Sequence, residues 1–167
     1  MKILLATDGS EFSRAAIEKC CEIAVKPENT EIKIISVYQV YIPLDMYPQS
    51  AQIAQEFECA MHEQAANYVD QAVAAIRKSL PDANVELSIQ VTMGATDRVI
   101  IETAENWNAD LIVVGSHGRG FWGRNLIGSV SDSLVHHAPC SVLVVRKTER
   151  ETSSNIDLTK IDLTNIT

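Results

Sequence analysis

The sequence contains no long hydrophobic run. Its first apolar stretch, residues 3–6, follows a single lysine. That stretch is far too short for a signal peptide or for a membrane-spanning helix, which needs about 20 apolar residues. We therefore expect a protein that stays in the cytoplasm and has no membrane partner.

Basic residues are scarce relative to acidic ones. The 167 residues include 14 lysines and arginines against 22 aspartates and glutamates, giving a formal net charge of -8 and a pI near 4.9. This charge opposes broad association with nucleic acid, so any bound anion must be held by a local site. The length and the 46% of hydrophobic residues suit one compact domain.

Cysteine and histidine are too few and too scattered for a disulfide scaffold or a metal site. The four cysteines are Cys20, Cys21, Cys59 and Cys140. They lack CxxC spacing, so we expect buried, reduced thiols, with metal or redox work as the alternative. His136 and His137 are neighbours, and on a helix their side chains point about 100° apart, which prevents them from chelating one ion together. We assign no metal ligands among the protein side chains.

The residues that are present alternate between strand-like and helix-like patterns. Apolar or alternating segments predict strands at residues 2–7, 32–37, 85–91, 111–114 and 141–145. Apolar residues at three- and four-residue steps predict helices at residues 10–25, 51–80, 95–106 and 130–137. The alternation of apolar and polar side chains over residues 85–91 is typical of a strand at the edge of a sheet.

This order predicts an α/β fold, a doubly wound, mainly parallel five-stranded sheet with helices on both faces, as in Rossmann-like proteins. Ligands of such sheets bind beyond the carboxyl ends of the strands, where connections reverse direction. Residues 1–146 would form this domain. Residues 147–167 are polar and lack a long apolar face. Their doubled Ile-Asp-Leu-Thr segment could dock as a strand on a partner, although the composition favours a frayed tail.

A glycine-rich segment joins the strand at 111–114 to the helix at 130–137. It reads Gly-Ser-His-Gly-Arg-Gly-Phe-Trp-Gly-Arg-Asn-Leu-Ile-Gly-Ser and begins at Gly115. Glycines allow close backbone approach and positive φ, and the free amides that open a helix, here around Ser129 and Val130, point at an anion. Residues 111–131 contain no acidic side chain but do contain Arg119, Arg124 and His117. This segment therefore suits a bound polyphosphate.

The spacing of this segment is specific. Four residues satisfy the pattern G-x2-G-x9-G-[S/T], namely Gly115, Gly118, Gly128 and Ser129. With Thr7 and Asp8 near the amino terminus, and with the run Asp-Leu-Ile-Val-Val-Gly-Ser-His-Gly-Arg from residue 110, the pattern closely resembles the ATP-binding universal stress proteins. The resemblance spans nearly all of residues 1–146, and the tail lies outside it.

The resemblance implies an ATP site. Residues that would flank adenine and ribose or line the base pocket are Ala6, Thr7, Asp8, Val37 and Val114. Residues that would hold ribose and phosphates are Gly115, Gly118, Gly128, Ser129, Val130 and Ser131. Ala6 stands where some ATP-binding relatives have proline, which alters packing more than hydrogen bonding. Because the chain has no Walker lysine, Mg²⁺ or Mn²⁺ near Asp8 is expected to compensate the triphosphate charge.

Each of these side chains also has a purely structural interpretation. Asp8 could serve only as a turn and cap residue, and Ser129 and Ser131 could only cap the helix that they open. Arg119 and Arg124 could contact phosphate, or they could be solvated loop charges. Phe121 and Trp122 are expected to form a hydrophobic lid or contact surface more than a base-stacking platform.

Three functions remain open. The sequence has no G-x-S-x-G elbow and no metal-ligand motif, so robust catalysis is not supported. The resemblance favours a regulatory or stress-response protein whose bound ATP changes its surface or its assembly. A slow Mg²⁺-dependent ATPase is the second hypothesis, and an interaction protein of the same fold with an empty pocket is the third. No motif in the sequence identifies the client proteins that such a regulator would bind.

The last apolar strand, Ser141–Val145, predicts the assembly. No later strand covers it within the domain, and an apolar edge is an aggregation hazard unless it is paired. In the family that the chain resembles, the corresponding edge commonly pairs with its copy across a two-fold axis, so we expect a homodimer. The tail from Lys147 could instead fold back over this edge and leave a monomer.

Overall fold

The computed structural model describes residues 1–25, 29–40, 51–81, 84–118 and 127–147. Its strands are β1 (Lys2–Ala6), β2 (Thr30–Tyr38), β3 (Val85–Met93), β4 (Leu111–Gly115) and β5 (Ser141–Val145). Its helices are α1 (Glu11–Ala24), α2 (Ala51–Ser79), α3 (Thr96–Trp107) and α4 (Ser129–His137). The described residues thus contain the five strands and four helices that the sequence predicts.

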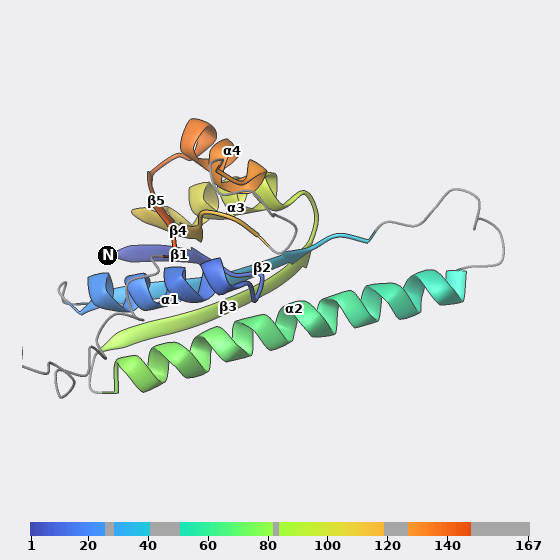
Figure 1. The fold of residues 1–167 in the computed structure, drawn as a ribbon, viewed down its shortest axis with the longest axis horizontal. Coiled ribbons are helices and arrows are strands. Elements are labelled where there is room, and N and C mark those ends of the chain that lie inside the picture. The colour runs from blue at the N-terminus through green and yellow to red at the C-terminus, as the bar shows by residue number, and fades with distance from the viewer. Residues whose placement is uncertain (26–28, 41–50, 82–83, 119–126, 148–167) are drawn as a thin grey trace, which may run out of the picture.

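The strands form one parallel sheet in the order β3-β2-β1-β4-β5. Helices α1 and α2 cover one face of this sheet, and α3 and α4 cover the other (Figure 1). The expected doubly wound α/β fold is therefore confirmed. The chain leaves β1 for β2 on one side and later returns to β4 on the other side. The switch point of the sheet consequently lies between β1 and β4.

Alternation along β1 explains the two layers of the core. Ile3 and Leu5 pack against α1 and α2, whereas Leu4 and Ala6 pack against α3 and α4. All four side chains are buried. A central strand that is apolar on both faces can only be stable between two helical layers. This packing fixes the carboxyl end of β1, where Thr7 and Asp8 follow.

The amino terminus of α1 is built by a side-chain cap, as expected. Ser10 is the N-cap, and its Oγ accepts a hydrogen bond from the backbone amide of Ser13 at 3.1 Å. Such a cap satisfies one of the amides that an α-helix leaves without a partner in its first turn. The cap places α1 directly after the end of β1.

Both edge strands lie where the sequence predicts them. On β3, Ile89 and Met93 are exposed while Val85, Leu87 and Val91 are partly buried against the core.

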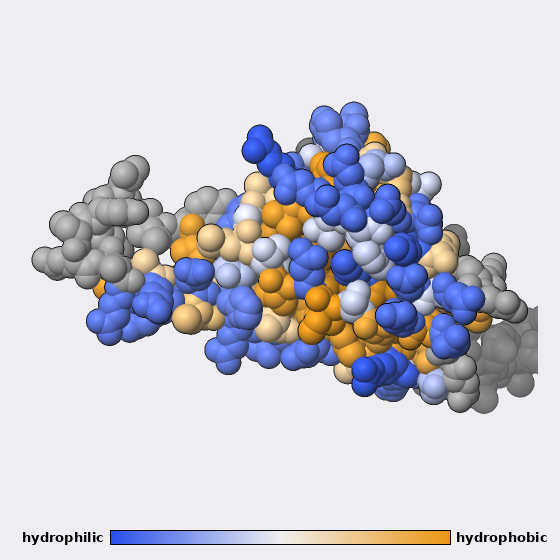
Figure 2. Space-filling view, turned by 180° about the vertical axis from the view of Figure 1, so that it is seen from behind, coloured by the Kyte–Doolittle hydropathy of each residue, from blue (hydrophilic) through white to orange (hydrophobic). Residues whose placement is uncertain are grey.

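From behind, hydrophilic residues cover much of the upper part of the molecule, formed by α3 and α4, and apolar residues show lower down (Figure 2). β2 and β3 are longer than predicted because they pair with each other up to Tyr38 and Met93.

The expectation of buried cysteines holds for only part of the set. Cys20 and Cys21 are buried on α1, and burial raises the pKa of Cys20 to about 12. Cys140 is half-buried, and Cys59 is exposed, so the expectation is wrong for Cys59. The reason is that the first turns of α2 extend past the sheet, as Figure 1 shows. Phe57 on the same turns is 59% exposed.

No helix within the described ranges is both long enough and apolar enough to cross a membrane.

Candidate functional site

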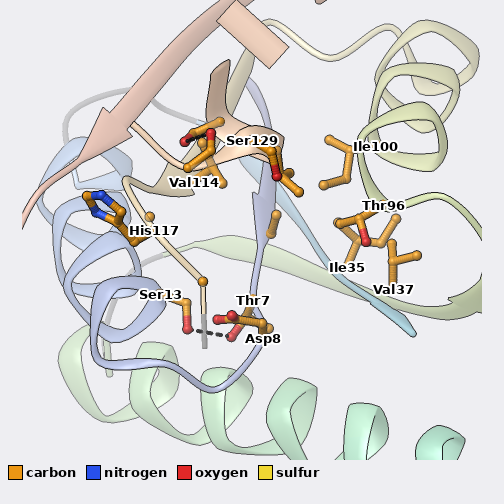
Figure 3. Close-up of a pocket in the computed structure, with 16 residues that line it drawn as sticks. Thr7, Asp8, Ser13, Ile35, Val37, Thr96, Ile100, Val114, His117 and Ser129 are labelled. Carbon is orange, nitrogen blue, oxygen red and sulfur yellow. Dashed lines mark hydrogen bonds between the residues drawn. The ribbon is translucent and has the colours of Figure 1, made fainter. Parts of the chain in front are cut away.

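A cavity of about 390 Å³ opens at the carboxyl ends of β1 and β4 (Figure 3). It is lined by all the candidate site residues that the structure describes: Ala6, Thr7, Asp8, Val37, Val114, Gly115, Gly118, Gly128, Ser129, Val130 and Ser131. Segments far apart in the sequence thus meet at the switch point of the sheet. Arg119, the remaining candidate, lies outside the described residues, as do Phe121, Trp122 and Arg124.

The cavity has an apolar half and a polar half. Figure 3 shows Ile35, Val37, Ile100 and Thr96 together on one side. Thr7, Asp8, Ser13 and His117 lie on the other side, toward α1 and the start of the glycine-rich segment. A ligand that fills the whole cavity must therefore combine an apolar or aromatic body with a polar end.

The glycine-rich segment is closed at its neck by hydrogen bonds to one carbonyl. The Ser116 carbonyl oxygen accepts from the backbone amide of Gly128 at 2.8 Å and from Ser131 Oγ at 3.1 Å. Ser131 Oγ also lies 2.9 Å from the Gly128 carbonyl oxygen, and the residue is only 2% exposed. The Ser131 hydroxyl therefore holds the two ends of the segment together and does not cap α4, so the capping role considered from the sequence is wrong for Ser131.

The amino terminus of α4 faces the cavity without a side-chain cap. Gly128 is the N-cap and has no side chain to offer. The first helical hydrogen bond runs from the amide of Asp132 to the Gly128 carbonyl oxygen at 2.9 Å. The amides of Ser129, Val130 and Ser131 precede that bond, and such amides have no acceptor within an α-helix. Together with the helix dipole, they can bind an anion.

Asp8 links β1 to the glycine-rich segment. Its Oδ1 accepts a hydrogen bond from the amide of Ser10 at 3.0 Å, so the turn role proposed from the sequence is present. Its Oδ2 lies 3.0 Å from the position that a Cβ on Gly118 would occupy. Since the two oxygens point to different partners, the turn role does not prevent Asp8 from contacting a ligand in the cavity.

The described glycines of the glycine-rich segment, Gly115, Gly118 and Gly128, do not adopt positive φ, which corrects the expectation from the sequence for these three residues. Among the described glycines, only Gly9 and Gly94 have positive φ. At Gly115 a Cβ would lie 2.7 Å from the carbonyl carbon of Phe12, and at Gly128 it would lie 3.2 Å from the Ser116 carbonyl oxygen. Here glycine permits close approach of two backbone segments.

Five residues outside the list of candidate contacts also line the cavity, namely Ser13, Ile35, Thr96, Ile100 and His117, of which the sequence had singled out only His117, as a basic group of the glycine-rich segment. Ser13 Oγ accepts a hydrogen bond from Thr7 Oγ1 at 3.3 Å. His117 Nδ1 lies 3.0 Å from Ser116 Oγ, and its ring centroid lies 5.0 Å from that of Phe12. The position of His117 within the glycine pattern was a usable signal. Thr96 and Ile100 carried no signal, because only the fold brings α3 to the cavity.

The described residues contain no group of three or more potential metal-ligating side chains.

The model of the universal stress protein family matches residues 1–146. Universal stress protein MJ0531 of Methanocaldococcus jannaschii is 31% identical over 150 residues, which cover 90% of this chain and 84% of that protein.

Solved structures share the fold. Universal stress protein UspA from Lactobacillus plantarum is 25% identical with a TM-score of 0.73, over 87% of this chain and 97% of that one. A universal stress protein family protein from Arabidopsis thaliana, solved with AMP bound, is 20% identical with a TM-score of 0.53, over 93% and 97% of the two chains. From the family match over residues 1–146 and the shared fold, the chain belongs to the universal stress protein family.

Proposed function

We propose that the cavity binds ATP and that the protein is a nucleotide-dependent regulatory protein of the stress response. The observation that carries this proposal is that one cavity joins an apolar half to the uncapped amino terminus of α4. An adenine ring suits the first feature, and a phosphate chain suits the second.

The proposed pose follows from the two halves. Adenine would lie against Ile35, Val37 and Ile100, and the ribose near Thr7 and Asp8. The phosphates would lie along Gly118 and the free amides of Ser129 and Val130. In an acidic protein, these amides offer a local positive potential for the phosphates. Arg119 follows Gly118 directly and is proposed as a further phosphate contact.

A family comparison supports an adenine nucleotide as the ligand class. The Arabidopsis thaliana protein of the same fold was solved with AMP bound. The extension from AMP to ATP rests on the length of the glycine-rich segment and on the α4 amides at its end. We propose that Mg²⁺ or Mn²⁺ accompanies the triphosphate, with the Asp8 carboxylate beside it, because the chain has no Walker lysine to balance the charge.

The hydrogen bonds made by the Ser131 hydroxyl favour a regulatory role over ATP hydrolysis. A slow ATPase would place Ser129 or Ser131 beside the γ-phosphate. The Ser131 hydroxyl already donates toward two backbone carbonyl oxygens, so its proton is directed toward the protein backbone and away from a γ-phosphate. In single-turnover assays we therefore expect the bound ATP to remain unhydrolysed over the lifetime of the complex.

We also propose that the protein forms a homodimer through β5. Within the described part of the chain β5 pairs only with β4, so its other edge has no strand beside it. Val142 and Val144 are only partly buried there. Pairing of this edge with a second copy would satisfy backbone groups and bury apolar side chains.

Titration calorimetry tests the ATP site with Gly118→Val. A valine side chain would meet the Asp8 carboxylate and fill the space for the phosphates, so ATP affinity should fall at least about tenfold. Circular dichroism checks that the variant is folded. Val135→Ala, an exposed position on the outer side of α4, is the matched control and should bind like the unmodified protein. Unchanged affinity in a folded Gly118→Val protein would move the site elsewhere.

The same titration, repeated in excess chelator, tests the metal. Because the triphosphate charge would then lack compensation, ATP affinity should drop in the unmodified protein. Equal affinity with and without chelator would contradict the metal part of the proposal and leave the nucleotide part standing.

A further inference from the structure

Helices α3 and α4 each contribute their first turn to the cavity. Thr96 and Ile100 of α3 lie in its apolar half, and Ser129 and Val130 of α4 lie where the glycine-rich segment ends. In the proposed pose, α3 therefore borders the base and α4 borders the phosphates. The separation between their first turns determines which ligands can reach both ends at once.

A hydrogen bond connects the first turn of α3 to the second turn of α4, outside the lining of the cavity. Ser133 Oγ donates to Asp97 Oδ2 at 2.8 Å, in a partly buried setting. Asp97 follows Thr96 directly, and Ser133 lies one helical turn after Ser129. Neither Asp97 nor Ser133 lines the cavity itself. The bond thus joins the wall of the apolar half to the wall of the phosphate half.

The bond is of the stronger, charge-assisted kind. The Ser133 hydroxyl is the main cause that holds the pKa of the Asp97 carboxyl below its usual value, and the amides of Arg98 and Asp97 add to it, against the opposing effect of partial burial. Asp97 is therefore a carboxylate near neutral pH. A hydroxyl that donates to a carboxylate makes a shorter and stronger bond than one that donates to a neutral acceptor.

The other contacts of the two helices are distributed unequally. The start of α4 is fixed to the loop neck through Ser131 and Ser116. α3 is tied to the sheet nearer its far end, where Gln90 Nε2 donates to Thr103 Oγ1 at 3.4 Å. The N-cap of α3 is Ala95, which makes no side-chain hydrogen bond. The Asp97–Ser133 bond is thus well placed to hold the first turn of α3.

We propose that the Asp97–Ser133 hydrogen bond sets the spacing between the base half and the phosphate half of the cavity, so that Asp97 is a positioning residue for nucleotides that occupy both. This inference rests on the proposed ATP site. A ligand that spans both halves depends on their spacing, because its contacts at each end must form together. A ligand that fills only one half does not depend on it.

Titration of two ligands into matched variants tests the proposal. ATP occupies both halves, whereas adenosine lacks phosphates and leaves the α4 amides free. Ser133→Ala removes the donor, so ATP affinity should fall about five- to tenfold, while adenosine affinity should stay within about twofold. Ser133→Thr keeps a hydroxyl and should restore ATP binding. Glu105→Ala, which removes an exposed carboxylate near the far end of α3, is the control and should leave both affinities unchanged.

A double-mutant cycle removes the remaining ambiguity. If the bond acts as a unit, Asp97→Ala combined with Ser133→Ala should weaken ATP binding no more than the stronger single variant does. Loss of ATP and adenosine affinity to the same extent would indicate a general structural role and overturn the proposal, as would an unchanged ATP affinity. If the unmodified protein binds neither ligand, the proposed function itself is wrong and this inference falls with it.

Discussion

Single residues in the connection from β1 to α1 combine conformational and contact requirements. Gly9 has φ +74°, a value that residues with a Cβ rarely adopt. A Cβ at this position would also lie 2.3 Å from the ring of Tyr68 on α2. The glycine therefore lets β1, α1 and α2 meet next to Thr7 and Asp8. It is a structural requirement of the site rather than a ligand contact.

Gly9→Ala should consequently destabilise the protein. The positive φ costs about 1–2 kcal/mol in an L-residue, and displacement of the Tyr68 ring adds roughly 1–3 kcal/mol more. The free energy of unfolding, measured by urea denaturation, should fall by about 2–5 kcal/mol. Gly118→Ala is the matched control, because its φ is not positive and its Cβ would meet only the Asp8 side chain at 3.0 Å. Equal stability of the two alanine variants would contradict this account.

The sequence predicted which glycines matter better than it predicted why each one is needed. The glycine pattern predicted the position of the segment, because the spacing of Gly115, Gly118 and Gly128 can be read directly from the sequence. The reason for each glycine was only partly predictable, since the crowding of Gly115 against Phe12 comes from helix packing that no local pattern encodes.

At the scale of elements, the two edge strands, β3 and β5, differ in their pattern of polar and apolar residues. β3 alternates apolar and polar residues along its length, as an edge strand of this kind should. β5 is apolar from Val142 to Val145, and Lys147 just after it forms a 2.7 Å ion pair with Glu11 of α1. The chain thus leaves the sheet beside the start of α1, and the outer edge of β5 is the candidate for pairing with a second copy.

Light scattering tests the dimer on the full chain and on a version ending at Lys147. Dimers are expected in both, because the proposed interface lies within β5. Val144→Pro removes a backbone amide from the edge and should convert the dimer to a monomer.

Two outcomes would contradict the proposed dimer. A full-length monomer that dimerises only after truncation would mean that residues 148–167 cover the edge of β5 in the same chain. A dimer that persists in Val144→Pro would place the interface on another surface. Val135→Ala, on the outer side of α4, is the control for a substitution away from the edge.

Elements were predicted well where the pattern is local. The helical period of α2 and the alternation of β3 identified both elements. The ends of β2 and β3 were missed by a few residues because Tyr38 and Met93 are held in the sheet by pairing with each other, across more than fifty positions of sequence. The contribution of Thr96 and Ile100 to the site was missed for the same reason, since tertiary packing places α3.

At the scale of the whole molecule, the central feature is the proposed local site for an anion in an acidic protein. The chain carries a net charge of -8, yet residues 111–131 contain no acidic side chain. The fold brings this segment to the switch point of the sheet, beside the ends of β1 and β4. Doubly wound sheets bind ligands at this point. Fold, charge distribution and local geometry therefore favour the same place.

Amide chemical shifts during a titration with ATP and Mg²⁺ test this account most directly, because they report every backbone position of a ¹⁵N-labelled protein at once. We predict saturable shifts at Asp8, Gly115, Gly118, Ser129 and Val130, with small shifts on β3 and on the exposed turns of α2. The absence of saturable shifts, or shifts confined to the groove between α1 and β5, would contradict the proposed nucleotide site.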